Sequence, residues 1–187
     1  MLLIISLIIV FLFIYFLKDS LKKHAGIYYI GAAVISIAVF LIGFLPMPLF
    51  VKNNILGIFA KGSLGTAMFV AVMYAGALPK GSKLIAPLMK IRGELSITAA
   101  ILVLCHNFTY GITYFKMLFI KPEALSATQL TAAIISLVLI IIMIVLTVTS
   151  FQAVRKKMQA KKWKQLQRTA YVFYGLMYVH IMLINIP

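Results

Sequence analysis

Acidic residues are nearly absent from this chain. Its 187 residues include 18 Lys and Arg but only 3 Asp and Glu, which gives a formal net charge of +15 at pH 7. In a soluble protein such a balance would indicate nucleic-acid binding. Here the cations lie between long apolar runs, and 64% of the residues are hydrophobic. We therefore expect no nucleic-acid partner, and we expect the lipid bilayer with its anionic headgroups instead.

Cysteine and cofactor-binding glycine motifs are equally scarce. Cys105 is the single cysteine, which excludes an internal disulfide and a Cys-based metal cluster. The stretch "LCHNF" does not match the C-x-x-C-H pattern of covalent haem attachment. A G-x-G-x-x-G dinucleotide fingerprint is also absent, so we expect any flavin-reducing domain to be a separate polypeptide.

Long apolar runs dominate what is present. Lipid cannot satisfy an open sheet edge, so runs of this length predict membrane-spanning helices. No polar linker is long enough to divide the chain, and we expect one domain over residues 1–187. The prediction is an all-α integral membrane protein, a bundle of six transmembrane helices. The expected spans are Leu2–Leu17, Ile27–Leu45, Ile55–Leu78, Leu95–Phe115, Thr128–Ser150 and Thr169–Ile186.

The cations are distributed unevenly over the connecting loops. A cleaved signal peptide has its positive charge before the apolar run, whereas here Lys18, Lys22 and Lys23 follow it, which indicates a retained first span. The third loop has Lys80, Lys83, Lys90 and Arg92, and the fifth has Arg155, Lys156, Lys157, Lys161, Lys162, Lys164 and Arg168. By the positive-inside rule these loops face the cytoplasm. For the run from Arg155 to Arg168, a docking face for an acidic redox partner is the alternative. Both termini then lie outside, in a multi-pass protein of the cell membrane, expected to be a bacterial cytoplasmic membrane.

Two histidines lie well inside predicted spans, where an ionisable residue indicates function. His106 follows Glu94 by twelve residues and His180 follows Arg168 by twelve residues. At 1.5 Å per residue, each imidazole lies about 18 Å from the cytoplasmic edge of a core ~30 Å thick. Two neutral histidines without Cys, Asp or Glu do not make a closed zinc site, whereas haem iron needs only axial ligands. The alternative is a pair of structural histidines, bonded to neighbouring helices, with Asn107 or a tyrosine as partner.

Two stretches resemble a known family. "TSFQAVRKKMQAKKWKQLQRTAYVFYGLMYVHIM" and "KIRGELSITAAILVLCHNFTYG" are similar to ferric-reductase-like transmembrane domains, and most of all to the haem-binding membrane subunits of bacterial methionine-sulfoxide reductase systems (the MsrQ group). The resemblance covers residues 27–187 as the ferric-reductase-like core, with 1–24 as an added span and first inner loop. By this resemblance we expect the family's last span to be absent. The matching residues are Arg92, His106, Tyr110, Thr149, Ser150, Trp163, Leu166, Arg168, Tyr171 and His180.

The chain departs from that family at its inner haem site. The family's first histidine of the basic-loop motif is Gln167 here, and Arg92 stands where a second inner ligand would be needed. We therefore expect one b-type haem, in the outer half, with His106 and His180 as iron ligands. His24 lies near the predicted height of Gln167, and most simply it is a solvated interfacial residue. A ligand role toward a second haem, a flavin or a quinone is its alternative.

A haem with two histidine ligands has no open position for a substrate, so it is suited to one-electron transfer. By resemblance, a cytoplasmic flavin reductase or a quinol would donate electrons. The acceptor outside would be an oxidoreductase, a flavoprotein or ferric iron. Lys61 and Tyr110 are candidates to contact the haem near its propionates, with outer-edge snorkelling and an interfacial aromatic position as the alternatives. The competing function is a small transporter or assembly factor with structural histidines and no haem.

The outer loop "KPEALSATQLT" has a weak similarity to sites where membrane redox subunits attach flavin to a threonine. It lacks the glycine of such sites. A helix N-cap at Ser126 or Thr128 is the favoured interpretation.

Overall fold

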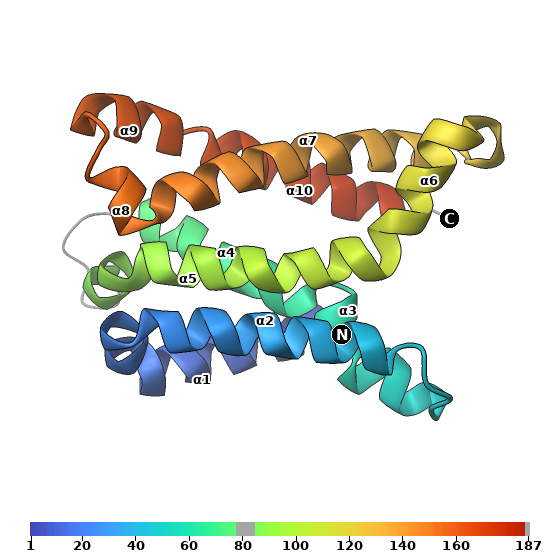
Figure 1. Ribbon diagram of the computed structural model, residues 1–187, viewed down its shortest axis with the longest axis horizontal. Coiled ribbons are helices and arrows are strands. Elements are labelled where there is room, and N and C mark those ends of the chain that lie inside the picture. Colours follow the sequence, from blue (N-terminus) through green and yellow to red (C-terminus); the bar gives the residue numbers. More distant parts are fainter. Residues whose placement is uncertain (78–84, 186–187) are drawn as a thin grey trace. The chain divides into compact units, whose positions relative to one another are not determined.

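The computed structural model describes residues 1–77 and 85–185, and within them the regular structure is entirely helical (Figure 1). Five helical segments are long and apolar enough to cross a membrane: Leu2–Lys23, Ala25–Ile42, Val51–Ala77, Ala86–Ile120 and Ala127–Ser150. The chain is therefore an all-helical, multi-pass membrane protein. The predicted span ends at 78 and 186, and the cations at 80 and 83, lie outside the described residues.

By contact clustering the chain divides into two compact units, residues 1–109 and 110–187. The first contains α1 (Leu2–Lys23), α2 (Ala25–Ile42), η1 (Val51–Ile55), α3 (Gly57–Ala60), α4 (Ser63–Ala77) and α5 (Ile85–His106). The π-helix η2 (Asn107–Gly111) crosses the boundary. The second unit continues with α6 (Ile112–Ile120), η3 (Pro122–Ala124), α7 (Ala127–Ser150), α8 (Gln152–Arg155), α9 (Ala160–Gln167) and α10 (Ala170–Asn185).

Helix α5 is the centre of the first unit, where it packs against α1, α2 and α4. Ile91, Leu95 and Cys105 of α5 are almost fully buried, as is Leu21 of α1. The remaining faces of α1 and α2 expose many large apolar side chains, as expected for helices that face lipid. Helix α4 approaches α5 closely at Gly65, where a Cβ would lie 2.5 Å from Val103 Cγ2 and 3.0 Å from the Ala99 carbonyl oxygen.

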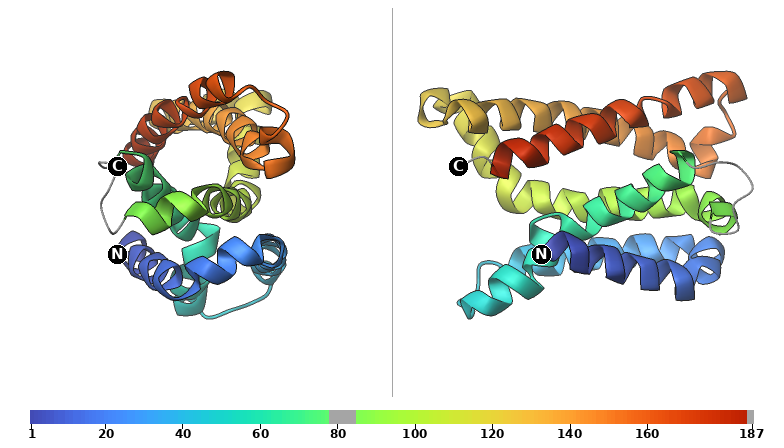
Figure 2. Two further views of the ribbon diagram at one scale, coloured as in Figure 1. Left: turned by 90° about the vertical axis from the view of Figure 1, so that its left-hand side faces the viewer. Right: turned by 180° about the vertical axis from the view of Figure 1, so that it is seen from behind.

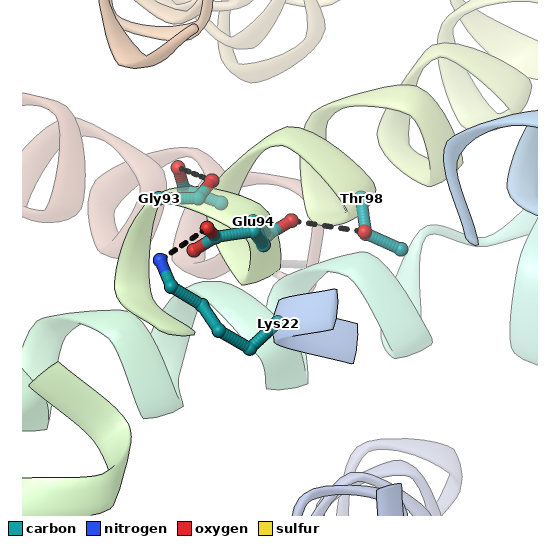
Figure 3. A network of polar contacts seen from close by, with 5 residues as sticks. Lys22, Gly93, Glu94 and Thr98 are labelled. Carbon is teal, nitrogen blue, oxygen red and sulfur yellow. Dashed lines mark hydrogen bonds and ion pairs between the residues drawn. The ribbon is translucent and has the colours of Figure 1, made fainter. Parts of the chain in front are cut away.

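An ion pair joins α1 to α5 (Figure 3). The Lys22 ammonium donates a hydrogen bond to Glu94 Oε1 at 2.5 Å, and Thr98 Oγ1 donates to the Glu94 carbonyl at 2.9 Å. Glu94 is 8% exposed. Because a lone carboxylate in an apolar bundle is costly, the lysine at the end of α1 makes this position tolerable.

Helix α5 is longer than the sequence indicated. It begins at Ile85 rather than Leu95, and its continuation through η2 and α6 extends to Ile120. Pro87 does not prevent this early start, since the first turn of a helix needs no N–H donor. The charged residues before Leu95 suggested a loop, but the structure accommodates them on a helix that is paired with α1.

The second unit is built on α7, which packs against α6, α8, α9 and α10. Helix α7 begins with a capping box: Gln129 N–H donates to Ser126 Oγ at 3.3 Å, and Ser126 N–H donates to Gln129 Oε1 at 3.0 Å. The predicted N-cap is thus confirmed at Ser126. Helices α7 and α10 run antiparallel and side by side (Figures 1 and 2). At 16 residues, α10 is short for a span.

Candidate functional site

His106 is the last residue of α5, immediately before the π-helix η2. Its Nδ1 lies 3.1 Å from the carbonyl oxygen of Ala60, the last residue of α3. Carbonyls in the last turn of a helix lack an intrahelical donor, so the end of α3 offers an acceptor to this ring. Ala60 and Cys105 are buried together with Val39, which places this contact beside an apolar cluster.

The helical structure is interrupted between α3 and α4, and this interruption lies against His106. Gly62 has φ of 72°, a left-handed conformation that ends α3 with a glycine after its C-cap, Lys61. A Cβ at Gly62 would lie 3.2 Å from both Cβ and Cγ of His106. Position 62 therefore requires glycine both for its backbone angle and for its distance from the ring.

Polar groups accumulate around this end of α5. Ser36 Oγ of α2 donates to the Ile101 carbonyl at 3.4 Å, and Thr109 Oγ1 donates to the Cys105 carbonyl at 2.7 Å. The Asn107 side-chain nitrogen is buried and has no hydrogen-bond partner among the described residues. Single π-turns occur often at functional sites in α-helices, and η2 follows His106 directly.

His180 lies on α10 and contacts α7. Its Nδ1 is 3.2 Å from the Ala132 carbonyl oxygen and 3.3 Å from Ser136 Oγ. These two residues are four positions apart on α7 and so belong to one face of that helix. The ring is partly buried.

The contacts of both histidines favour the same tautomer of the neutral ring. A carbonyl oxygen only accepts, so Nδ1 must carry the proton in the His106–Ala60 and His180–Ala132 contacts. If His180 Nδ1 instead accepted from Ser136, its lone pair would face the Ala132 oxygen. In this tautomer the lone pair belongs to Nε2. Metal-ligating histidines typically have this arrangement, with the other ring nitrogen bonded to a carbonyl.

The two histidines belong to different units, His106 to the first and His180 to the second. Among the described residues, no three side chains of the His, Cys, Asp and Glu types gather into a metal-binding group. The chemistry that each site offers is therefore one oriented imidazole with its basic nitrogen at Nε2. An imidazole oriented in this way has the chemistry of a single axial ligand of haem iron.

Two further predicted site residues lie close to His106 in the chain or in space. Lys61 sits between Ala60 and Gly62, the two residues that contact the His106 ring, and its side chain is exposed. Tyr110 lies within η2, four residues after His106, and is 40% exposed. The Lys61 side chain extends along α3, with its Cδ 3.8 Å from the position that a Cβ would take at Gly57.

His24 and Arg92, two of the predicted inner-site residues, lie at one level of the first unit. His24 separates α1 from α2, and its side chain is exposed and makes no capping hydrogen bond. Helices α2 and α5 run in the same direction (Figure 1), and Ser36 contacts Ile101 and Cys105. Since both helices rise equally per residue, His24 is level with about residues 89–93 of α5, which include Arg92.

Gln167, the third inner-site residue, is bound within the second unit. Its Nε2 donates to Thr149 Oγ1 at 3.1 Å and reaches the Leu146 carbonyl at 3.5 Å. Trp163, one turn earlier on α9, donates from Nε1 to the Thr149 carbonyl at 2.9 Å. Gln167 thus attaches α9 to the end of α7.

Sequence reasoning missed the residues that orient the two rings. Ala60, Ala132 and Ser136 have no distinctive side chain for this role, and two of them act through a backbone carbonyl. Gly62 had a signal in the sequence, because a Lys-Gly pair inside an apolar run favours a helix C-terminus. Nothing local linked that glycine to His106, 44 positions later.

Comparisons with known proteins give one relative without a described activity. No protein-family model matches the chain, and no solved structure matches it. The chain is 40% identical over 187 residues to an uncharacterized protein of Treponema pallidum (strain Nichols), with 97% of this chain and 51% of that protein covered. The chain thus spans about half the length of the curated relative it matches.

Proposed function

We propose that the chain is a b-type haem electron-transfer protein of the ferric-reductase-like kind, with His106 and His180 as the axial ligands. The observation that supports it most is the shared tautomer. Each Nδ1 faces a backbone carbonyl, at 3.1 Å for His106 and 3.2 Å for His180. Each imidazole therefore has its basic nitrogen at Nε2, as an axial ligand requires.

Haem held by two histidines supplies one-electron chemistry. The residues of the chain would bind and orient it and exclude water. The Ala60 carbonyl and the Gly62 backbone hold the His106 ring, and Ala132 with Ser136 holds the His180 ring. Lys61, next to Ala60, would receive a propionate carboxylate, and Tyr110 would donate to one from its hydroxyl.

The proposal includes six spans, with both termini outside and electrons moving outward across the cell membrane. The five long apolar helices and the shorter α10 give the six segments. The pairing of Lys22 with Glu94 supports the depth assigned to His106, because the basic end of α1 lies beside position 94 of α5. His106 follows twelve residues later, or about 18 Å along the helix.

The partners follow from the direction of transfer. A cytoplasmic flavin reductase or a quinol would supply electrons, and an oxidoreductase, flavoprotein or ferric iron outside would accept them. We propose no inner haem, because the Gln167 amide is committed to Thr149 and amides are poor iron ligands. We propose instead that a flavin or a quinone near His24 and Arg92 relays electrons on the inner side.

A small transporter or assembly factor is the second candidate function. The same contacts favour it, because a structural histidine is also satisfied by a carbonyl. The two functions predict different purified proteins. A transporter would be purified without haem and therefore colourless, and it would keep its activity when either histidine is replaced.

The test is an optical spectrum of the detergent-purified protein, oxidised and then reduced with dithionite. We expect a low-spin b-type spectrum at one haem per chain, lost in His106→Ala and in His180→Ala. His24→Ala is the matched control and should keep the spectrum. Two haems per chain would mean that a further ligand exists, and no Soret band after expression with ample haem would refute the redox function.

A further inference from the structure

The connection between α7 and α10 is a short segment rich in exposed Lys and Arg. We call residues 151–168 the basic arm; it contains α8 and α9. It bears seven of the 18 Lys and Arg, all of them exposed: Arg155, Lys156, Lys157, Lys161, Lys162, Lys164 and Arg168. Such a density of like charge creates a positive potential that attracts anionic groups.

The basic arm is fixed to the end of α7 rather than loose. Trp163 Nε1 donates to the Thr149 carbonyl at 2.9 Å, and Gln167 Nε2 donates to Thr149 Oγ1 at 3.1 Å. The Arg155 guanidinium stacks on the Trp163 ring, 4.3 Å from its centroid. Trp163 and Gln167 are one turn apart, so one face of α9 contacts α7 and the lysines occupy the others.

The second unit cannot neutralise this arm by itself. The three acidic residues of the chain are Asp19, Glu94 and Glu123. Glu123 alone belongs to the second unit, and it precedes α7, whereas the arm follows α7. The length of α7 separates them, about 35 Å for 24 residues. No acidic side chain of this unit therefore lies close enough to compete with an outside anion for the arm.

Membrane lipid is the partner that matches the position and chemistry of the arm. The arm directly follows α7, which is long and apolar enough to cross a membrane, so its cations lie at the end of that helix, where it would leave the membrane. An amphipathic helix with a tryptophan and several lysines lies in the interface and is attracted to anionic headgroups. We propose that the basic arm binds the phosphate headgroups of anionic phospholipids in the membrane that holds α7.

Trp163 makes the proposal directly measurable, because it is the only tryptophan in the chain. The full chain is reconstituted in phosphatidylcholine bilayers that contain either brominated phosphatidylglycerol or brominated phosphatidylcholine. Brominated acyl chains quench tryptophan fluorescence on contact. We expect stronger quenching by phosphatidylglycerol at equal bromine content, reduced by high salt.

The variant Lys161→Gln/Lys162→Gln/Lys164→Gln should lose this preference, by about tenfold or more in relative affinity, since each surface cation contributes a factor of several. The matched control Lys52→Gln/Lys116→Gln/Lys121→Gln also removes three exposed cations and should keep the preference. Thermal unfolding of both variants checks that they are folded. Equal quenching by the two lipids in the unaltered chain, or an equal loss in both variants, would overturn the proposal and leave an acidic protein as the partner to test.

Discussion

His106 and His180 are oriented by the same hydrogen bond but by different kinds of structure. The acceptor for His106 is the carbonyl of Ala60 at the end of a broken helix, and the Gly62 backbone lies against the ring. The acceptors for His180 are Ala132 and Ser136 on the unbroken helix α7. The His106 ring is held at an interruption between two helices, where the Gly62 backbone lies against it. The His180 ring is held by two hydrogen-bond acceptors on a regular helix.

This difference predicts unequal sensitivity to substitution. At the first site one conformation of one glycine determines both the carbonyl position and the space for the ring. At the second site the acceptor carbonyl is fixed by α7, and the serine adds a second, exchangeable contact. We therefore expect the His106 site to fail through backbone strain and the His180 site to tolerate the loss of one acceptor.

Gly62→Ala should have the largest effect. A non-glycine residue at φ of 72° costs about 1–2 kcal/mol, and a methyl 3.2 Å from the His106 ring adds roughly 1–3 kcal/mol of overpacking. We expect a clear loss of thermal stability and a displaced His106, measured by the melting temperature and by the haem content of the purified protein.

Gly31→Ala and Gly175→Ala are the matched controls, one in each unit. A Cβ at either position meets nothing within 4 Å. Both glycines lie inside α-helices, where alanine stabilises by about 0.5–1 kcal/mol. If Gly62→Ala behaved like these two controls, the proposed close contact between position 62 and the His106 ring would be refuted.

Glu94→Gln should have the next largest effect. It removes the charge that pairs with Lys22, and a hydrogen bond to a charged group contributes about 1.5–3 kcal/mol. We expect the first unit to unfold at a lower temperature. Glu123→Gln, at an exposed position of η3, should change stability by less than about 0.5 kcal/mol.

A double-mutant cycle with Lys22→Gln sharpens this test. Lys22 is 47% exposed and can reach water on its own, so its substitution alone should cost less than that of Glu94. If the two changes were additive, the contact in Figure 3 would contribute nothing to stability.

The same ion pair explains why the sequence predicted the helices better than their ends. Apolar runs alone located the five helical segments that are long and apolar enough to cross a membrane, because lipid leaves helices as the simplest solution. The start of α5 was placed ten residues late because Lys90, Arg92 and Glu94 interrupt the apolar pattern. Only the tertiary partner Lys22 makes Glu94 compatible with a packed helix, and such pairing between distant positions is not visible locally.

The candidate site, too, could be predicted from the sequence only in part. His106 and His180 could be selected as candidates because an ionisable residue within an apolar run is itself a signal. The carbonyls of Ala60 and Ala132 could not, because every residue has one, and the three-dimensional path of the chain decides which is offered to a ring. The charged run before α10 likewise concealed helix α9, whose contacts come from two residues, Trp163 and Gln167.

Gln167→Ala tests those contacts and should have a moderate effect. It removes the hydrogen bond to Thr149 Oγ1, worth about 0.5–1.5 kcal/mol, so α9 should detach more readily from α7. We expect faster trypsin cleavage at the lysines of α9 in the reconstituted protein. Gln165→Ala, exposed on the same helix, should not change the cleavage rate.

Ser136→Ala should have the smallest effect, and it completes the comparison of the two histidines. It removes one acceptor from His180, while the Ala132 carbonyl at 3.2 Å keeps the proton on Nδ1. We expect a loss below about 1 kcal/mol in stability and an unchanged low-spin haem spectrum. Thr131→Ala on the same helix removes only a bond to its own backbone and serves as the control. A loss of haem as severe as in Gly62→Ala would show instead that His180 depends on the serine, because the α7 carbonyl alone would then be insufficient to hold the ring.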